Sequence, residues 1–193
     1  MEKLFFKGNP TYTKGTFPVK GEKAPCFKLI NKELEEISFC SEKGEFNGCN
    51  CADGKIIVLN IFPSLDTPVC ANTVRKFNQL SSQLEDVQLL CISQDLPFAA
   101  ERFCVIEEID NVIFASAYRS PEFGVDYGVL IEDGMMKGLF ARAIIIIDRE
   151  FNVVFSQIVE EISNEPDYDL ILNKLRGLSG CIKDCECNPI CDC

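Results

Sequence analysis

Cysteine is the residue type whose number and placement in this sequence point most directly to chemistry. The chain has 193 residues, twelve cysteines and no histidine. A mechanism that needs an imidazole base, a histidine metal ligand or a Ser-His-Asp arrangement is therefore excluded. A deprotonated thiol is both a nucleophile and a soft metal ligand. The cysteines therefore indicate redox catalysis or metal binding.

Cys70 has the setting expected of a reactive thiol. A β-branched run at 56–61 precedes it, and Thr67 and Pro68 are suited to the cap and first position of a helix, which puts Cys70 in the first helical turn. The positive end of a helix, helped by a nearby cation, stabilises a thiolate. The Thr67 hydroxyl is expected to donate a hydrogen bond to this thiolate or to a substrate oxygen, and Pro63 to stiffen the approach and exclude water. Taken alone, Cys70 is also explained as a small buried side chain, and only its neighbours favour the nucleophile.

The elements that must position this thiol follow from apolar patterns. Near-continuous apolar runs predict strands of one sheet that is covered on both faces, at 56–61, 87–93, 112–115, 143–147 and 153–159. Apolar residues at spacings of three and four predict a helix at 68–84. Further helices are expected at 98–109, after Pro97, and at 166–176, ended by Gly177. Turn residues near Gly8 and Gly15 predict an N-terminal hairpin. The pattern is that of an α/β domain with a helix–sheet–helix core.

Several segments resemble a known family. Asn60 to Cys70, followed by Val74 to Asn78, resembles closely the catalytic motif of the bacterial thiol peroxidases, the atypical two-cysteine peroxiredoxins. Leu90 to Cys104 looks like the resolving-cysteine region of that family, and Lys137 to Ala143 like its active-site arginine strand. The likeness covers about residues 4–176.

The resemblance implies a fold, an activity and a set of residues. The fold is a thioredoxin-like three-layer α/β domain with an N-terminal β-hairpin, which forms a homodimer and uses no cofactor. Cys70 is the peroxidatic nucleophile, Cys104 is the resolving cysteine of the same chain, and Arg142 and Thr67 stabilise the reacting atoms. The substrates are hydrogen peroxide and organic hydroperoxides, and a thioredoxin-like dithiol protein is the electron donor.

These roles agree with thiol chemistry. Attack of a thiolate on a peroxide moves negative charge to the departing oxygen, so hydrogen-bond donors aimed there, including the backbone N–H of Cys70, stabilise the transition state. The sulfenic acid formed on Cys70 needs a second thiol before peroxide oxidises it further. Cys104 lies 34 positions away on another predicted helix, and a disulfide requires Cα atoms within about 7 Å. If the two helices hold these atoms farther apart, both must unwind locally to close the bond, as the resemblance implies. Without the resemblance, Cys104 could equally be a packed thiol and Arg142 a surface charge.

The resemblance leaves nine cysteines outside Cys70, Cys91 and Cys104 without a role. Cys91 is expected to be inert core, and Cys26 and Cys40 to be ordinary half-buried residues. Three Cys-x-Cys pairs occur, Cys49 and Cys51 in a polar loop and Cys185 with Cys187 and Cys191 with Cys193 in the tail, which also carries Cys181. For the tail, binding of a soft metal such as Zn²⁺, a built-in thiol relay and the absence of any catalytic role remain alternatives.

Charge and apolar content limit the possible partners and the expected location of the protein. The formal net charge of −11 disfavours nucleic acid and anionic lipid as partners. The first twenty residues carry no signal-peptide core, and the longest apolar run, 143–147, is too short to span a bilayer. A cytoplasmic protein is expected, with a domain at 1–176 and a cysteine-rich tail at 177–193.

Two other functions stay open at this point. A general disulfide oxidoreductase is one, although Cys70 has no second cysteine three positions away. A protein that binds metal or buffers thiols through its tail is the other.

Overall fold

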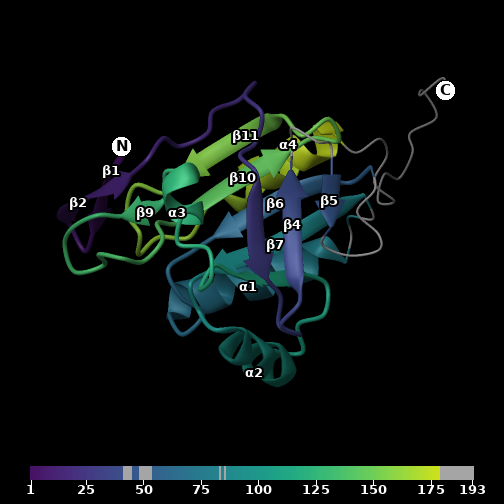
Figure 1. Cartoon of the computed structure of the whole chain (residues 1–193), viewed down its shortest axis with the longest axis horizontal. Coiled ribbons are helices and arrows are strands. Elements are labelled where there is room, and N and C mark those ends of the chain that lie inside the picture. Colours follow the sequence, from purple (N-terminus) through teal and green to yellow (C-terminus); the bar gives the residue numbers. More distant parts are fainter. Residues whose placement is uncertain (41–44, 48–53, 83, 85, 179–193) are drawn as a thin grey trace.

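The computed structural model describes residues 1–40, 45–47, 54–82, 84 and 86–178 (Figure 1). The predictions for Cys49, Cys51 and the five tail cysteines concern residues outside these ranges. Metal binding and a thiol relay there stay predictions, as does the division of the chain at 176/177.

An eight-stranded sheet forms the centre of the molecule, in the order β11-β10-β6-β7-β8-β3-β4-β5. Its strands are β3 (Phe27–Ile30), β4 (Glu36–Cys40), β5 (Glu45–Asn47), β6 (Ile56–Ile61), β7 (Val87–Ser93), β8 (Ile113–Ser116), β10 (Ala143–Ile147) and β11 (Val153–Ile158). The predicted strands are all present, within one residue at each end. Strands β6, β7 and β8 are parallel, so their carboxyl ends meet at one edge of the sheet.

Helices connect these strands as the sequence predicts, with different ends. Helix α1 (Pro68–Ser81) begins where expected but stops before Leu84, which is buried in the turn that follows. Helix α2 spans Pro97–Glu107 and α4 spans Tyr168–Leu178. The expectation that Gly177 ends the last helix is wrong, because α4 continues through it. A short helix, α3 (Phe123–Asp126), was not predicted.

The two faces of the sheet are covered differently. One face packs against α1, α2 and α4, in a core that includes Cys70, Val74, Ala100, Cys104 and Ile171. The other face lies in a second core rich in aromatic side chains, to which α3 and the β3–β4 end of the same sheet contribute: Phe17, Phe27, Phe39, Phe123, Tyr127 and Phe140. Helices therefore cover the first face as predicted, whereas on the second face strands of the sheet itself and the short α3 supply most of the apolar side chains.

The N-terminal hairpin is confirmed. Strands β1 (Lys3–Phe6) and β2 (Asn9–Lys14) pair with each other, and β9 (Leu130–Ile131) extends them to a three-stranded sheet at the left of Figure 1. Strand β1 also binds the chain beyond β11: the Phe5 N–H donates to the Glu160 carbonyl at 2.6 Å, and the Ile162 N–H donates to the Phe5 carbonyl at 2.9 Å.

Among the described residues, no helix has the length and apolar character needed to cross a membrane.

Candidate active site

Cys70 lies in the first turn of α1, just beyond the carboxyl end of β6. The predicted cap is confirmed: Thr67 is the N-cap, and its Oγ1 accepts a hydrogen bond from the Cys70 N–H at 3.4 Å. The Cys70 side chain is completely buried. The sheet and the helix therefore hold the sulfur in a fixed position inside the protein.

Arg142 reaches Cys70 because of the register between two strands. Strands β10 and β6 are antiparallel with Ala143 opposite Ile61, so Arg142 lies opposite the first residue beyond β6. Its Nη2 donates to the Cys70 Sγ at 3.4 Å, and its Nε donates to the Ile162 carbonyl at 3.2 Å. Arg142 is only 1% exposed, which rules out the alternative of a surface charge.

The remaining guanidinium nitrogen of Arg142 is evidence for a binding site. Its Nη1 is buried and has no hydrogen-bond partner among the described residues. A buried donor without a partner is costly in free energy, so it requires a function or a bound group. Beside a thiol, this donor is suited to an oxygen atom of a substrate.

The Thr67 hydroxyl is oriented differently from the expectation. It donates to the Ser64 carbonyl at 3.1 Å while it accepts from the Cys70 N–H. Its proton is thus turned away from the sulfur, because capping engages the hydroxyl and the backbone donor together. Both expected donors must therefore give up these bonds before they can bind a substrate oxygen. Pro63 lies in the same loop and is buried, as a residue that excludes water must be.

Asp95 is a site residue that sequence reasoning did not single out. Its carboxylate accepts hydrogen bonds from the Ser64 hydroxyl at 2.8 Å, the Leu65 N–H at 2.7 Å and the Ser93 hydroxyl at 2.9 Å. It therefore ties the loop before α1 to the loop before α2. The position of Asp95 just before Pro97, within the segment that resembles the resolving-cysteine region, could have identified it.

Cys104 lies in α2 and is also almost fully buried, at 6% exposed. Burial raises the pKa of its thiol, and the charge of Lys32 only partly opposes this effect. Cys70 and Cys104 belong to the same apolar core, and both are thiols in the structure. The two predicted partners are thus brought to one layer of the fold.

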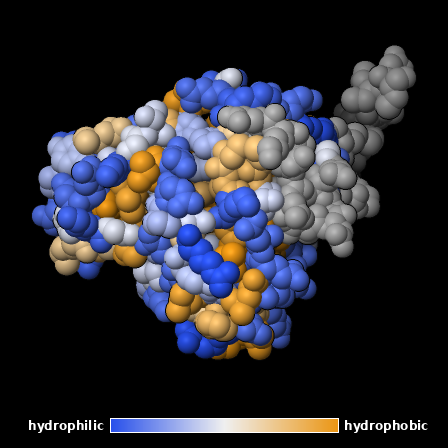
Figure 2. Space-filling model, viewed as in Figure 1, coloured by the Kyte–Doolittle hydropathy of each residue, from blue (hydrophilic) through white to orange (hydrophobic). Residues whose placement is uncertain are grey.

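Helix α2 is held by few side chains. Its buried residues are Pro97, Ala100 and Cys104, whereas Val105 and Ile106 are 75% and 69% exposed. Figure 2 shows the resulting apolar surface at the lower end of the molecule. Segments with few buried apolar contacts open locally at low free energy. Cys104 therefore lies on an element suited to local unfolding.

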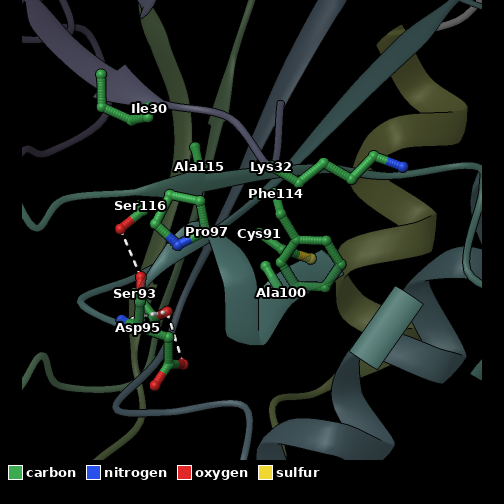
Figure 3. A pocket seen from close by; sticks show the side chains of 10 residues that line it. All are labelled: Ile30, Lys32, Cys91, Ser93, Asp95, Pro97, Ala100, Phe114, Ala115 and Ser116. Atoms are coloured by element: carbon green, nitrogen blue, oxygen red, sulfur yellow. Dashed lines mark hydrogen bonds between the residues drawn. The ribbon is translucent and has the colours of Figure 1, made fainter. Parts of the chain in front are cut away.

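A small hollow lies beneath the start of α2 (Figure 3). Its lining includes Cys91 of β7, Asp95 in the loop before α2 and Ala100 of α2, and it has room for roughly one water molecule. Burial raises the pKa of Cys91 to about 12. Such a thiol stays protonated at neutral pH, which supports the expectation that Cys91 is inert.

One ion pair joins the two cysteine-bearing helices. Arg75 of α1 donates from Nε and Nη2 to the two carboxylate oxygens of Glu107, at 2.7 Å each. The hydrogen bond from Arg75 holds the pKa of Glu107 below its usual range. Glu107 is the last residue of α2, so this pair fastens its carboxyl end to α1.

Comparison with known proteins identifies the family. A family model described as Redoxin matches residues 19–172. The thiol peroxidase of Corynebacterium glutamicum is 47% identical over 175 residues, which are 91% of this chain and 99% of that protein. The chain belongs to the redoxin family. The thiol peroxidase of Mycobacterium tuberculosis is another similar redoxin, 44% identical over 91% of this chain and 99% of its own.

Solved structures of similar proteins have the same fold. The crystal structure of a peroxiredoxin-like protein from Aquifex aeolicus is 38% identical, with a TM-score of 0.82 over 93% of this chain and 98% of that one. A thiol peroxidase from Chromobacterium violaceum, 22% identical, matches with a TM-score of 0.76 over 91% of this chain and 95% of that one, which supports the fold. The thioredoxin-like fold and the membership of the peroxiredoxin-type peroxidases are therefore confirmed.

The alternative of a metal-binding redoxin finds no site in the described part of the chain. There, no group of three or more cysteine, aspartate or glutamate side chains could hold a metal ion.

Proposed function

We propose that this redoxin reduces hydrogen peroxide and organic hydroperoxides through Cys70. The observation that carries the proposal is the contact between the Arg142 guanidinium and the Cys70 Sγ, with a second guanidinium nitrogen buried and unused beside it. The cation compensates a thiolate charge on sulfur in an apolar environment. The unused donor is available to the peroxide.

The first step forms a sulfenic acid. The thiolate attacks one peroxide oxygen, an S–O bond forms, and the O–O bond breaks. The departing oxygen takes the bonding electron pair and then a proton, and leaves as water or an alcohol. Arg142 stabilises the charge that develops on this oxygen, which is stronger in the transition state than in the bound peroxide.

The second step uses Cys104. Its sulfur attacks the sulfenic sulfur of Cys70, a disulfide forms, and the hydroxyl leaves as water. A thioredoxin-like dithiol then reduces the disulfide by exchange. Local unfolding of α2, which few side chains anchor, brings Cys104 to Cys70.

We further propose that the redoxin forms a homodimer in the cytoplasm. Leu96, Phe98, Val105 and Ile106 give α2 an exposed apolar surface that an interface would cover. A reducing compartment would return Cys70 and Cys104 to the thiols from which the proposed reaction starts. Sedimentation of the reduced protein tests the dimer.

Peptide mapping of peroxide-treated protein tests the reaction. One equivalent of hydrogen peroxide, added to the reduced full chain, is expected to link the peptides that contain Cys70 and Cys104. Replacing Cys104 by serine should abolish the link and leave Cys70 as sulfenic acid, which a second equivalent of peroxide should oxidise to sulfinic acid, since no thiol traps it. Recovery of both cysteines as thiols while peroxide is consumed would contradict the proposal.

The Arg75–Glu107 pair is expected to slow formation of this disulfide. Glu107→Gln should increase the rate of the resolving step about two- to fivefold, as expected for loss of a partly exposed ion pair. Alkylation quenched at set times after peroxide addition measures the rate. Lys76→Gln is the matched control. Lys76 also lies on α1, and its replacement breaks the ion pair with Glu165 but leaves α2 unchanged.

Acid should remove this difference. Because the pKa of Glu107 is lowered in the fold, the pair is complete above the usual glutamate pKa and is lost as the pH falls through the lowered value. The rate ratio between Glu107→Gln and wild type, each measured at the same pH, should therefore approach one in acid. A ratio that is constant with pH would exclude this role of the pair.

A further inference from the structure

Cys26 and Cys40 form a second pair of neighbouring thiols. Their Sγ atoms are 3.0 Å apart. Strands β3 and β4 are antiparallel with Phe27 opposite Phe39, and one step further along the ladder places Cys26 opposite Cys40. Opposed residues of such a ladder have Cα atoms about 4.5–5.5 Å apart, within the roughly 4.4–6.8 Å that a disulfide spans. The backbone therefore already fits a bond between these sulfur atoms.

The pair lies on the outer side of the hairpin. Phe27 and Phe39 are buried, with stacked rings 5.1 Å apart. Side chains alternate along a strand, so the neighbouring cysteines point to the opposite side. Cys26 is exposed and Cys40 is partly exposed. A dissolved reagent can therefore reach Cys26, which Cys70 and Cys104 do not allow in their buried positions.

The pair is also separate from the candidate active site. The Phe39 ring lies 5.2 Å from that of Phe151, in the turn between β10 and β11. This turn is at the end of the sheet where β6 begins, because Ile147 pairs with Ile57. Cys70 follows the other end of β6, a strand about 20 Å long. Cys26 and Cys40 therefore lie toward the end of the sheet opposite to Cys70.

We propose that Cys26 and Cys40 are a second redox site, a cross-strand dithiol that a disulfide compound oxidises to a disulfide. The Cys26 thiolate attacks one sulfur of the compound, whose S–S bond breaks and releases a first thiol. Cys40 then attacks the Cys26 sulfur, and the mixed disulfide releases a second thiol that takes the remaining proton. The pair loses two electrons and two protons, and the disulfide compound is reduced to two thiols.

The test uses the full chain with Cys70→Ser, so its result does not depend on the peroxidase reaction. The reduced protein is incubated with excess oxidised glutathione, and remaining thiols are alkylated. Trypsin separates the two cysteines, because Lys23, Lys28, Lys32 and Lys43 place Cys26 in peptide 24–28 and Cys40 in peptide 33–43. We expect these two peptides to be linked, with the loss of two hydrogen atoms, and dithiothreitol to separate them.

Other outcomes would overturn the proposal. Recovery of both cysteines as alkylated thiols would show that the pair is not oxidised. Links from Cys26 or Cys40 to other cysteines of the chain would show a different pairing.

A second measurement keeps the test independent of mapping. A cross-link that closes the loop between Cys26 and Cys40 should raise the midpoint of thermal unfolding by about 5–10 °C. In the same Cys70→Ser chain, adding Cys26→Ser or Cys40→Ser should abolish this rise. In the otherwise wild-type chain, either substitution should leave peroxide consumption unchanged. An equal rise in the serine variants would assign the effect to other cysteines.

Discussion

Replacing Cys70 by serine should abolish peroxide consumption, with a fall in rate of at least about 10³-fold. A serine hydroxyl stays protonated at neutral pH and forms no sulfenic acid, so the O–O bond has no nucleophile. The contact with Arg142 cannot compensate, because the cation stabilises a charge that serine does not carry. Consumption of hydrogen peroxide with a dithiol reductant in excess measures the effect.

Cys91→Ala is the matched control for Cys70→Ser. It also removes a buried thiol from the same core, at a position where the pKa of about 12 indicates an unreactive group. Its peroxidase activity should stay within about twofold of wild type. Activity that survives in Cys70→Ser and disappears in Cys91→Ala would transfer the nucleophile to Cys91.

Replacing Arg142 should give the second largest loss, about 10²- to 10³-fold in kcat/KM for Arg142→Gln, as for removal of a transition-state donor. The guanidinium serves in three directions: Nη2 to the Cys70 sulfur, Nε to the Ile162 carbonyl and Nη1 to the proposed substrate site. Arg142→Lys keeps the charge but not the planar fork, so it should recover only part of the activity.

Two controls separate this effect from damage to the fold. Arg149→Lys changes a partly exposed arginine in the turn after β10, which donates to the Gly54 carbonyl at 2.7 Å, and should leave the activity unchanged. Thermal unfolding of each variant reports stability directly. Wild-type rates in Arg142→Lys would contradict the need for a forked donor, and wild-type rates in Arg142→Gln would exclude Arg142 from the reaction.

The sequence predicted the local features of the site well. The cap at Thr67 and the start of α1 follow from residues next to each other, because capping depends on the first turn alone. Strands β6, β7 and β10 were predicted because strands that are covered on both faces are continuously apolar. These features need no knowledge of distant contacts.

Features that depend on long-range register could not be predicted from local patterns. The contact between Arg142 and Cys70 follows from the pairing of β10 with β6, and only the resemblance to a family indicated it. The meeting of Cys26 with Cys40 requires the pairing of β3 with β4, two short strands separated by a polar turn. Likewise, the direction of the Thr67 hydroxyl toward the Ser64 carbonyl depends on the side-chain rotamer, which residue spacing does not predict.

The burial of both Cys70 and Cys104 has a consequence for the order of events in a catalytic cycle. A molecule as small as hydrogen peroxide can diffuse through transient gaps, whereas a protein that delivers electrons cannot touch either sulfur while both are enclosed. In the cycle proposed above, the reducing protein therefore meets only the oxidised form, in which α2 is open and the disulfide is exposed. Burial of the two sulfur atoms would thus keep the electron donor from binding productively to the reduced form and direct it to the oxidised one.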